Sequence, residues 1–240
     1  MSPRLRAFQS AVAQVLRDLG RGLLDIIYPP RCLGCGARPE SPYLPLCPRC
    51  LQSLERAPDT GVAARLDRLA TGGEVFNGTL ALWVFDEGGT LQAVQHALKY
   101  GNRPRYGVPL GRLMGQAFAE KYPSPDGVVP IPLHTTRRLE RGYNQSATLA
   151  EGAADALDCA HRPDLLDRPH PTRSQTGLSR EERWRNVQDA FAAAPECAGG
   201  QWLLVDDVLT TGSTTVAAAQ TLDEAGADTL YLATLGLARQ

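Results

Sequence analysis

The stretch that decides the fold reads LLVDDVLTTGSTT (residues 203–215), and its polarity changes halfway along. Its first part has the apolar composition of a buried strand and leads into two adjacent acids. Its second part holds small hydroxyl side chains around one glycine, and a helical pattern over residues 213–226 follows. This order predicts a strand, a loop and a helix N-terminus at the carboxyl end of a parallel sheet, where such sheets bind ligands.

The loop in this stretch has the groups that bind a phosphate. Backbone N–H groups and the positive end of a helix dipole favour an anion. The loop adds hydroxyl groups and a glycine that permits close approach, in the residues Thr210, Thr211, Gly212, Ser213 and Thr214. Carboxylates repel phosphate, so Asp206 and Asp207 are expected to accept hydrogen bonds from ribose hydroxyls. A divalent cation can join them by taking oxygens from the sugar and a second phosphate. The pattern predicts a ribose 5-phosphate site, and a chance Asp-Asp before a helix cap is the alternative.

Strand-like and helical patterns alternate along the rest of the chain. Strands are expected over residues 74–85, 126–133, 201–207 and 229–238, with a weaker one over 187–191. Helices are expected over residues 89–102, 107–122, 144–157 and 213–226, and a helix that fades into a linker over 51–73. The polar stretch 161–183 is expected to hold no core element. Such alternation predicts an α/β fold with a mostly parallel sheet covered by helices on both faces.

Length and charge set broad limits on what the protein is. The chain has 240 residues, enough for one α/β domain and a small module, and its formal net charge of −1 says little about partners. Between Lys99 and Arg141 there are eight basic and three acidic residues, which fits either a local anionic partner or a solvated surface. No apolar run reaches the ~20 residues needed to span a bilayer, so a cytoplasmic location is expected. Residues 1–29 have an amphipathic helical pattern, which favours packing on the same protein over binding a partner or a membrane surface.

Four of the six cysteines form two C-x2-C pairs, at Cys32 and Cys35 and at Cys47 and Cys50. Such pairs can bring four thiolates onto one structural Zn²⁺, and residues 30–56 are therefore expected to be a zinc-ribbon-like module. Two disulfides are the alternative, which would need an oxidising compartment. Cys159 and Cys197 lack this spacing and are expected to be unpaired thiols. The main domain is then expected to cover residues 73–240.

Several motifs, taken together and in order, resemble one family. They are LLDIIYPPRCLGCG (23–36), HALKYGNR (96–103), VVPIPLHTTRRLERGYNQS (128–146) and SQTGLSREERWRNVQDAF (174–191). The acidic strand end itself resembles the signature of the type I phosphoribosyltransferases. With these motifs the chain is similar to the ComF family of competence-related, phosphoribosyltransferase-like proteins over about residues 23–236. No Walker-type loop or G-x-G-x-x-G is present, so neither an ATP site nor a dinucleotide site is supported.

The resemblance implies a type I phosphoribosyltransferase-like sheet whose acids hold the ribose of phosphoribosyl pyrophosphate and whose loop holds its 5-phosphate, with Mg²⁺. Lys99 and Arg137, with Arg138 and Arg141, are expected near the phosphates, and Gln175, Arg180 and Arg183 are expected on a loop that closes over the ligand.

For function, the resemblance implies a role in DNA uptake. One hypothesis is Mg²⁺-dependent phosphoribosyl transfer, although no acceptor pocket or general base is identified, so the question of activity stays open. The other is a non-catalytic role on single-stranded DNA with a helicase-like competence protein, in which the phosphoribosyl site acts as a sensor. Tyr100, Tyr106 and Tyr143 are then candidates for stacking on bases.

Overall fold

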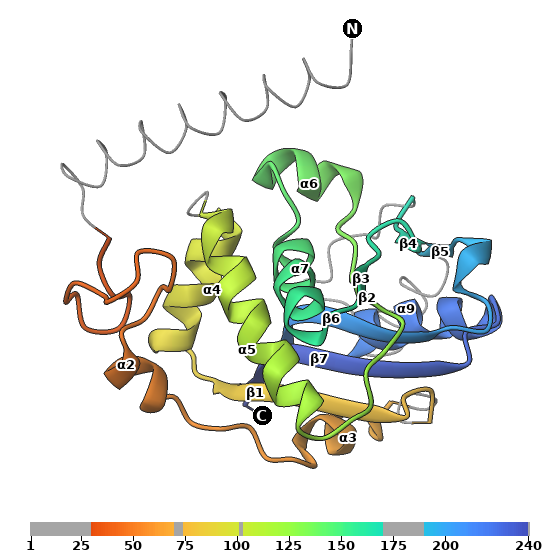
Figure 1. The fold of residues 1–240 in the computed structure, drawn as a ribbon, viewed down its shortest axis with the longest axis horizontal. Coiled ribbons are helices and arrows are strands. Elements are labelled where there is room, and N and C mark those ends of the chain that lie inside the picture. Colours follow the sequence, from red (N-terminus) through yellow and green to blue (C-terminus); the bar gives the residue numbers. More distant parts are fainter. Residues whose placement is uncertain (1–29, 70–73, 101–102, 170–189, 240) are drawn as a thin grey trace, which may run out of the picture.

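The computed structural model describes residues 30–69, 74–100, 103–169 and 190–239 (Figure 1). The expected N-terminal amphipathic helix (residues 1–29) and the loop candidates Gln175, Arg180 and Arg183 lie outside these residues. The boundaries expected for the three segments therefore remain predictions.

A parallel sheet forms the centre of the described structure. Its five strands run in the order β1-β7-β6-β2-β3, and every neighbouring pair is parallel. Their bounds are β1 Gly78–Phe85, β2 Gly127–Pro130, β3 Ala160–His161, β6 Gln201–Leu209 and β7 Thr229–Ala238. A short antiparallel pair, β4 (Leu166–Asp167) and β5 (Ala192–Ala193), stands apart from this sheet. The predicted α/β fold, a parallel sheet flanked by helices, is confirmed.

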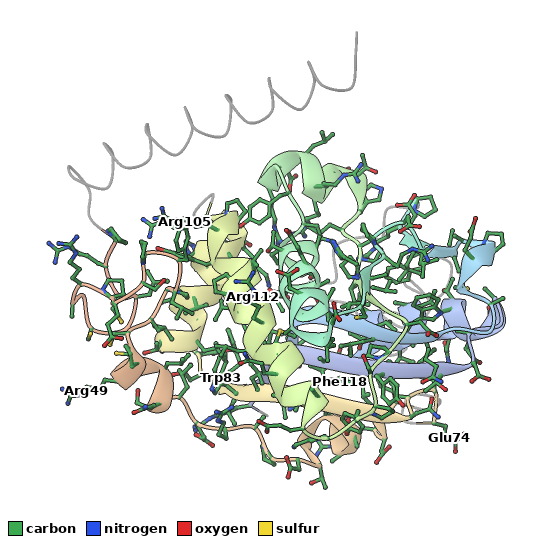
Figure 2. All side chains as sticks on the ribbon, viewed as in Figure 1. Arg49, Glu74, Trp83, Arg105, Arg112 and Phe118 are labelled. Carbon is green, nitrogen blue, oxygen red and sulfur yellow. The ribbon has the colours of Figure 1, made fainter. Side chains whose placement is uncertain are left out.

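Helices cover both faces because alternate residues of the central strands are apolar on both sides. In β6, Leu203 and Val205 pack into one buried cluster, and Trp202 and Leu204 pack into another. The first cluster includes residues of α4 (Thr90–Tyr100), α5 (Gly107–Ala119) and α7 (Gln145–Leu157), and the second includes residues of α3 (Gly61–Leu66) and α9 (Ser213–Glu224). Figure 2 shows side chains filling the space between the layers, with Trp83 and Phe118 inside and Arg49 and Glu74 at the periphery.

Helices α5 and α7 pack backbone against backbone at glycines. A Cβ atom on Gly111 would lie 1.9 Å from the carbonyl oxygen of Leu149, and one on Gly152 would lie 1.9 Å from the carbonyl oxygen of Val108. Only glycine permits this approach at these two positions, so the position of α7 over the sheet is closely fixed.

The structure differs from the sequence predictions in several places. The single helix expected over residues 51–73 is replaced by α2 (Pro48–Gln52) and α3, which are separated by a segment containing Pro58. A seven-residue helix, α6 (Thr135–Arg141), forms where no helix was expected. The expectation that the polar stretch beginning at residue 161 holds no core element is wrong for its first part, because Leu165 and Leu166 are buried. Of the weak strand predicted over residues 187–191, only 190 and 191 are described, and β5 follows them directly.

Strand β6 is also longer than predicted. It was expected to end at Asp207, but it continues to Leu209, with Val208 opposite Gly236 and Leu209 opposite Leu237 of β7. Both added residues are apolar and buried, which explains why pairing continues past the acids.

Candidate functional site

Asp207 faces the helix layer that contains α4. It is 4% exposed, and its Oδ2 lies 2.7 Å from Lys99 Nζ. Gln95, one turn earlier on α4, donates to the same oxygen from Nε2 at 3.3 Å. The structure therefore brings the predicted residues Lys99 and Asp207 together, and Lys99 compensates the charge of a buried carboxylate.

Asp206 faces the start of α7. Its Oδ1 accepts a hydrogen bond from Ser146 Oγ at 2.8 Å and another from the backbone N–H of Asp207 at 2.8 Å. The pKa of Asp206 is raised to about 7, because burial disfavours its charge and because Asp207 is negative. The hydrogen bonds from Ser146 and from the Asp207 N–H, together with the charge of Lys99, act in the opposite direction. The two acids thus have different partners: Asp207 contacts Lys99 of α4, and Asp206 contacts Ser146 of α7.

Arg168 lies near Asp206, and Arg137 of α6 lies near Arg168. The pKa of Arg168 is lowered, mainly because burial disfavours its charge; the charge of Asp206 raises this pKa and the charge of Arg137 lowers it. Arg168 also lies over the Phe191 ring at 5.1 Å, whereas Arg137 is exposed on α6. The predicted residue Arg137 is therefore close to a second arginine, Arg168, that the sequence did not single out.

The hydroxyl-rich loop follows β6 directly and leads into α9. Gly212 precedes the helix with a left-handed φ of 87°, which favours glycine. Ser213 N–H donates to Thr211 Oγ1 at 3.4 Å, and the hydroxyls of Thr211 and Ser213 are 3.3 Å apart. Thr210 is exposed, and Thr211 and Thr214 are half-buried. The loop therefore presents hydroxyls and helix-terminal N–H groups at the end of β6, as a phosphate site requires.

Arg65 of α3 connects this loop to the end of β7 through hydrogen bonds to backbone carbonyl oxygens. Its guanidinium donates to the carbonyl oxygens of Thr210 and of Ala238 at the end of β7. Because both acceptors are backbone atoms, sequence motifs give no signal for this contact.

The remaining predicted arginines and tyrosines divide into exposed and buried groups. Arg138 is exposed, whereas Arg141 donates to Gln145 Oε1 at 2.9 Å and lies over the Tyr100 ring at 5.4 Å. Tyr100 is 62% exposed and can stack on a base. Tyr106 is fully buried, so the expectation that it stacks on bases is wrong. Tyr143 is half-buried and donates its hydroxyl to the carbonyl oxygen of Leu98.

The four cysteines of the two pairs converge in one cluster. Their sulfur atoms all lie within 4.8 Å of one another, and Sγ of Cys35 and Cys47 are 3.8 Å apart. This contact brings the two C-x2-C pairs together. Its sulfur–sulfur distance matches the one expected between two ligands of a tetrahedral site with Zn–S bonds of about 2.3 Å. The residues therefore fit a structural Zn²⁺ and not two disulfides, and all six cysteines are free in the structure.

The protonation of the cluster also fits a metal site. Against the effect of burial, backbone N–H groups led by that of Cys47 lower the pKa of the Cys32 thiol to about 6. The hydrogen bond with Cys35 and the other neighbouring thiols raise the pKa of Cys50 to about 12. Sulfur atoms this close cannot all ionise without a cation, and Zn²⁺ supplies that charge when it is bound.

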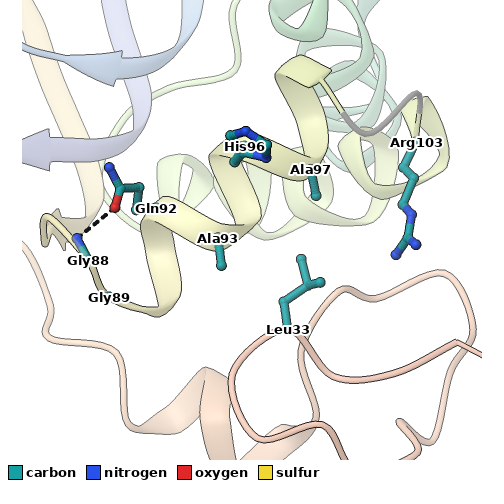
Figure 3. Close-up of a pocket in the computed structure, with 8 residues that line it drawn as sticks. All are labelled: Leu33, Gly88, Gly89, Gln92, Ala93, His96, Ala97 and Arg103. Carbon is teal, nitrogen blue, oxygen red and sulfur yellow. Dashed lines mark hydrogen bonds between the residues drawn. The ribbon is translucent and has the colours of Figure 1, made fainter.

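A cavity of about 620 Å³ lies between this cysteine module and α4, away from the acids (Figure 3). Leu33 of the module faces Ala93 and Ala97 of α4, and Arg103 borders one end. Arg103 is oriented by Tyr106, to whose hydroxyl it donates at 3.1 Å. This cavity is separate from the predicted ribose site.

Comparisons with known proteins place the chain among named relatives. A family model described as a double zinc ribbon domain matches residues 23–60. The chain is 33% identical over 206 residues to the DNA utilization protein YhgH of Salmonella typhi, covering 84% of this chain and 81% of that protein. It is 31% identical over 201 residues to YhgH of Escherichia coli K12, covering 82% and 79%. It is 35% identical over 118 residues to competence protein F of Haemophilus influenzae, covering 48% and 51%.

Solved structures show only distant likeness. One is described as the allosteric regulatory enzyme of purine biosynthesis, with 20% identity, a TM-score of 0.40 and coverage of 58% of this chain and 29% of that one. Another is the glutamine phosphoribosylpyrophosphate amidotransferase of B. subtilis, with 19% identity, a TM-score of 0.38 and coverage of 58% and 30%. In the described residues, no helix is both long and apolar enough to cross a membrane.

Proposed function

The chain belongs to the ComF family, with the DNA utilization protein YhgH among its relatives, and on that premise we propose that it binds phosphoribosyl pyrophosphate in a role linked to DNA uptake or use. The observation that supports the ligand is the joint position of two acids and a hydroxyl-rich loop at the carboxyl end of β6. Asp206 and Asp207 would accept from the ribose hydroxyls, and the residues from Thr210 to Thr214 would hold the 5-phosphate.

The arginines near Asp206 support the pyrophosphate end of the ligand. Arg137 and Arg168 repel each other electrostatically, and an anion between them would relieve that repulsion. Mg²⁺, when bound with the ligand, would neutralise further phosphate charge. In a transfer reaction, the bond between the anomeric carbon and pyrophosphate would break, pyrophosphate would leave with the bonding electrons, and an acceptor would form the new bond. The protein's part in that reaction is to position the sugar and neutralise the leaving group.

The ligand assignment can be tested by titrating phosphoribosyl pyrophosphate and Mg²⁺ into the protein in a calorimeter. Asp207→Asn removes an anionic acceptor and is expected to weaken binding about tenfold or more, because hydrogen bonds to charged groups are the stronger ones. Asp155→Asn is a matched control, because Asp155 is an exposed acid on α7 that pairs with Arg112. Equal affinities of wild type and Asp207→Asn would refute the ribose assignment.

A second function, binding of single-stranded DNA together with a helicase-like partner, is supported by one surface. Tyr100 is exposed beside Arg141, and Arg103 and Arg105 follow a few residues later in the chain. Bases can stack on such an aromatic ring while arginines contact phosphates. Affinity for an oligothymidine should then fall steeply with salt and fall further in Tyr100→Ala. An affinity that is the same at low and moderate salt would contradict this function.

A further inference from the structure

The turn formed by residues 144–146 begins α7 and contacts the residue that follows β2. Asn144 Oδ1 accepts from the Ser146 N–H at 3.1 Å and so caps α7, while its Nδ2 donates to the carbonyl oxygen of Ile131 at 3.0 Å. Ile131 directly follows β2. One side chain thus fixes the first turn of α7 against the end of the sheet.

The first turn of α7 is also fixed from its sides. Gln145 is 3% exposed and accepts from Arg141, and the glycine contacts with α5 hold the helix laterally. Ser146 is 1% exposed, and its hydroxyl donates to Asp206 Oδ1. A buried hydroxyl on a fixed helix turn that meets a carboxyl group at 2.8 Å has little freedom to adopt another arrangement.

From this geometry we infer that Ser146 is the positioning residue for Asp206: it fixes Oδ1, together with the Asp207 N–H, and directs Oδ2 to a ribose hydroxyl. The inference rests on the proposed phosphoribosyl site and adds the turn at residues 144–146 to it. In this arrangement the segment YNQS (residues 143–146) contributes to binding of the sugar, whereas the sequence predicted only phosphate contacts for this motif.

The charges around Asp206 determine how the role of Ser146 can be measured. Asp207 is its negative neighbour on β6, Lys99 approaches from α4, and Arg168 from the segment after β4. Burial raises the pKa of Asp206 to about 7, and the Ser146 hydroxyl lowers it by stabilising the ionised form. Removal of that hydroxyl must therefore raise the pKa of Asp206 further.

The test compares Ser146→Ala with Thr148→Val. The control removes a hydroxyl from the same helix turn, since Thr148 Oγ1 donates to the carbonyl oxygen of Gln145 and not to an acid. The pKa of Asp206 is followed in the protein alone by carbon-13 NMR of its carboxyl group, and affinity for phosphoribosyl pyrophosphate with Mg²⁺ is measured from pH 6 to pH 9. A third variant, Ser146→Thr, keeps the hydroxyl and should retain the wild-type titration.

In Ser146→Ala we expect the Asp206 titration to move up by about one pH unit, and affinity at pH 7 to fall about fivefold because the ionised fraction falls by that factor. Because binding uses the ionised acid, the loss should shrink at high pH. Thr148→Val should show neither effect. An unchanged Asp206 titration, or the same loss of affinity at every pH, would overturn the positioning role. If wild type fails to bind at any pH but the titration still moves in Ser146→Ala, the contact stands and the proposed function is the part that fails.

Discussion

Alanine at Gly111 tests how closely α7 is held over the site. The added Cβ would lie 1.9 Å from the carbonyl oxygen of Leu149, 2.8 Å from its carbonyl carbon and 3.0 Å from its Cα. All three atoms belong to the backbone of α7, so no side-chain rotation can relieve the contact. Since Cβ contacts below 3.0 Å essentially never occur, the two helices must separate by about 1 Å.

The cost of that separation follows from two opposing effects. Overpacking in a close-packed interior costs about 1–3 kcal/mol, and a collision with backbone belongs at the upper end. Alanine in place of glycine inside a helix returns about 1 kcal/mol of helix propensity. We expect Gly111→Ala to lose about 2 kcal/mol of unfolding free energy, or about 4–8 °C in Tm for a chain of this size.

Thermal and urea unfolding measure this loss. Gln116→Ala on the exposed side of α5 is the control and should remain within about 0.5 kcal/mol of wild type. Gly115→Ala should lose less than Gly111→Ala, because its Cβ would lie 2.7 Å from the carbonyl oxygen of Ala153. A Gly111→Ala protein at least as stable as wild type would refute the close backbone packing of α5 and α7.

Two further predictions concern the cysteine cluster and Asp206. Cys47→Ser should reduce bound zinc, measured by elemental analysis, to well below one ion per chain, while Cys159→Ser should keep it; full zinc in Cys47→Ser would exclude Cys47 as a ligand. Asp206 holds its proton to about pH 7 in the folded protein and to about its ordinary value of 3.8 when unfolded, so the folded state binds more protons between these values. The unfolding free energy of wild type relative to Asp206→Asn should therefore fall as pH rises from 5 to 8, and a rise over this range in urea titrations would contradict the raised pKa of Asp206.

The sequence predicted the sheet because its central strands have unusually clear patterns. The expected strand over residues 229–238 and helix over residues 144–157 agree closely with β7 and α7, since apolar runs and an Asn cap determine both. The convergence of Cys32, Cys35, Cys47 and Cys50 was also predictable, because the C-x2-C spacing leaves few other arrangements. The helix α6 was missed because its charged sequence has no apolar face, and it has no buried residue.

Site partners that come from other elements were not predictable in the same way. Ser146 and Gln95 contact the acids because the start of α7 and the second half of α4 lie next to β6, and pattern rules do not give such distances. Arg65 binds carbonyl oxygens, which every residue possesses. The sequence signal for Ser146 is its position just after Asn144, a residue type that caps helices. This signal identifies the start of a helix, but it does not identify what the serine contacts.

The continuation of β6 past the acids changes what the pair can do. Had the strand ended at Asp207, as the sequence predicted, both carboxylates could have turned to one side. In a continuing strand, neighbouring side chains point in different directions, so Asp207 reaches α4 and Asp206 reaches α7. In the proposed complex, a ribose bound by both Asp206 and Asp207 would therefore lie across the end of β6. One of its hydroxyls would face α4 and another α7, and its phosphate would face the loop before α9. Each acid has its own partner in this geometry, Lys99 for Asp207 and Ser146 for Asp206. Because the pKa of Asp206 is raised to about 7, loss of Asp206 should weaken binding mainly above pH 7.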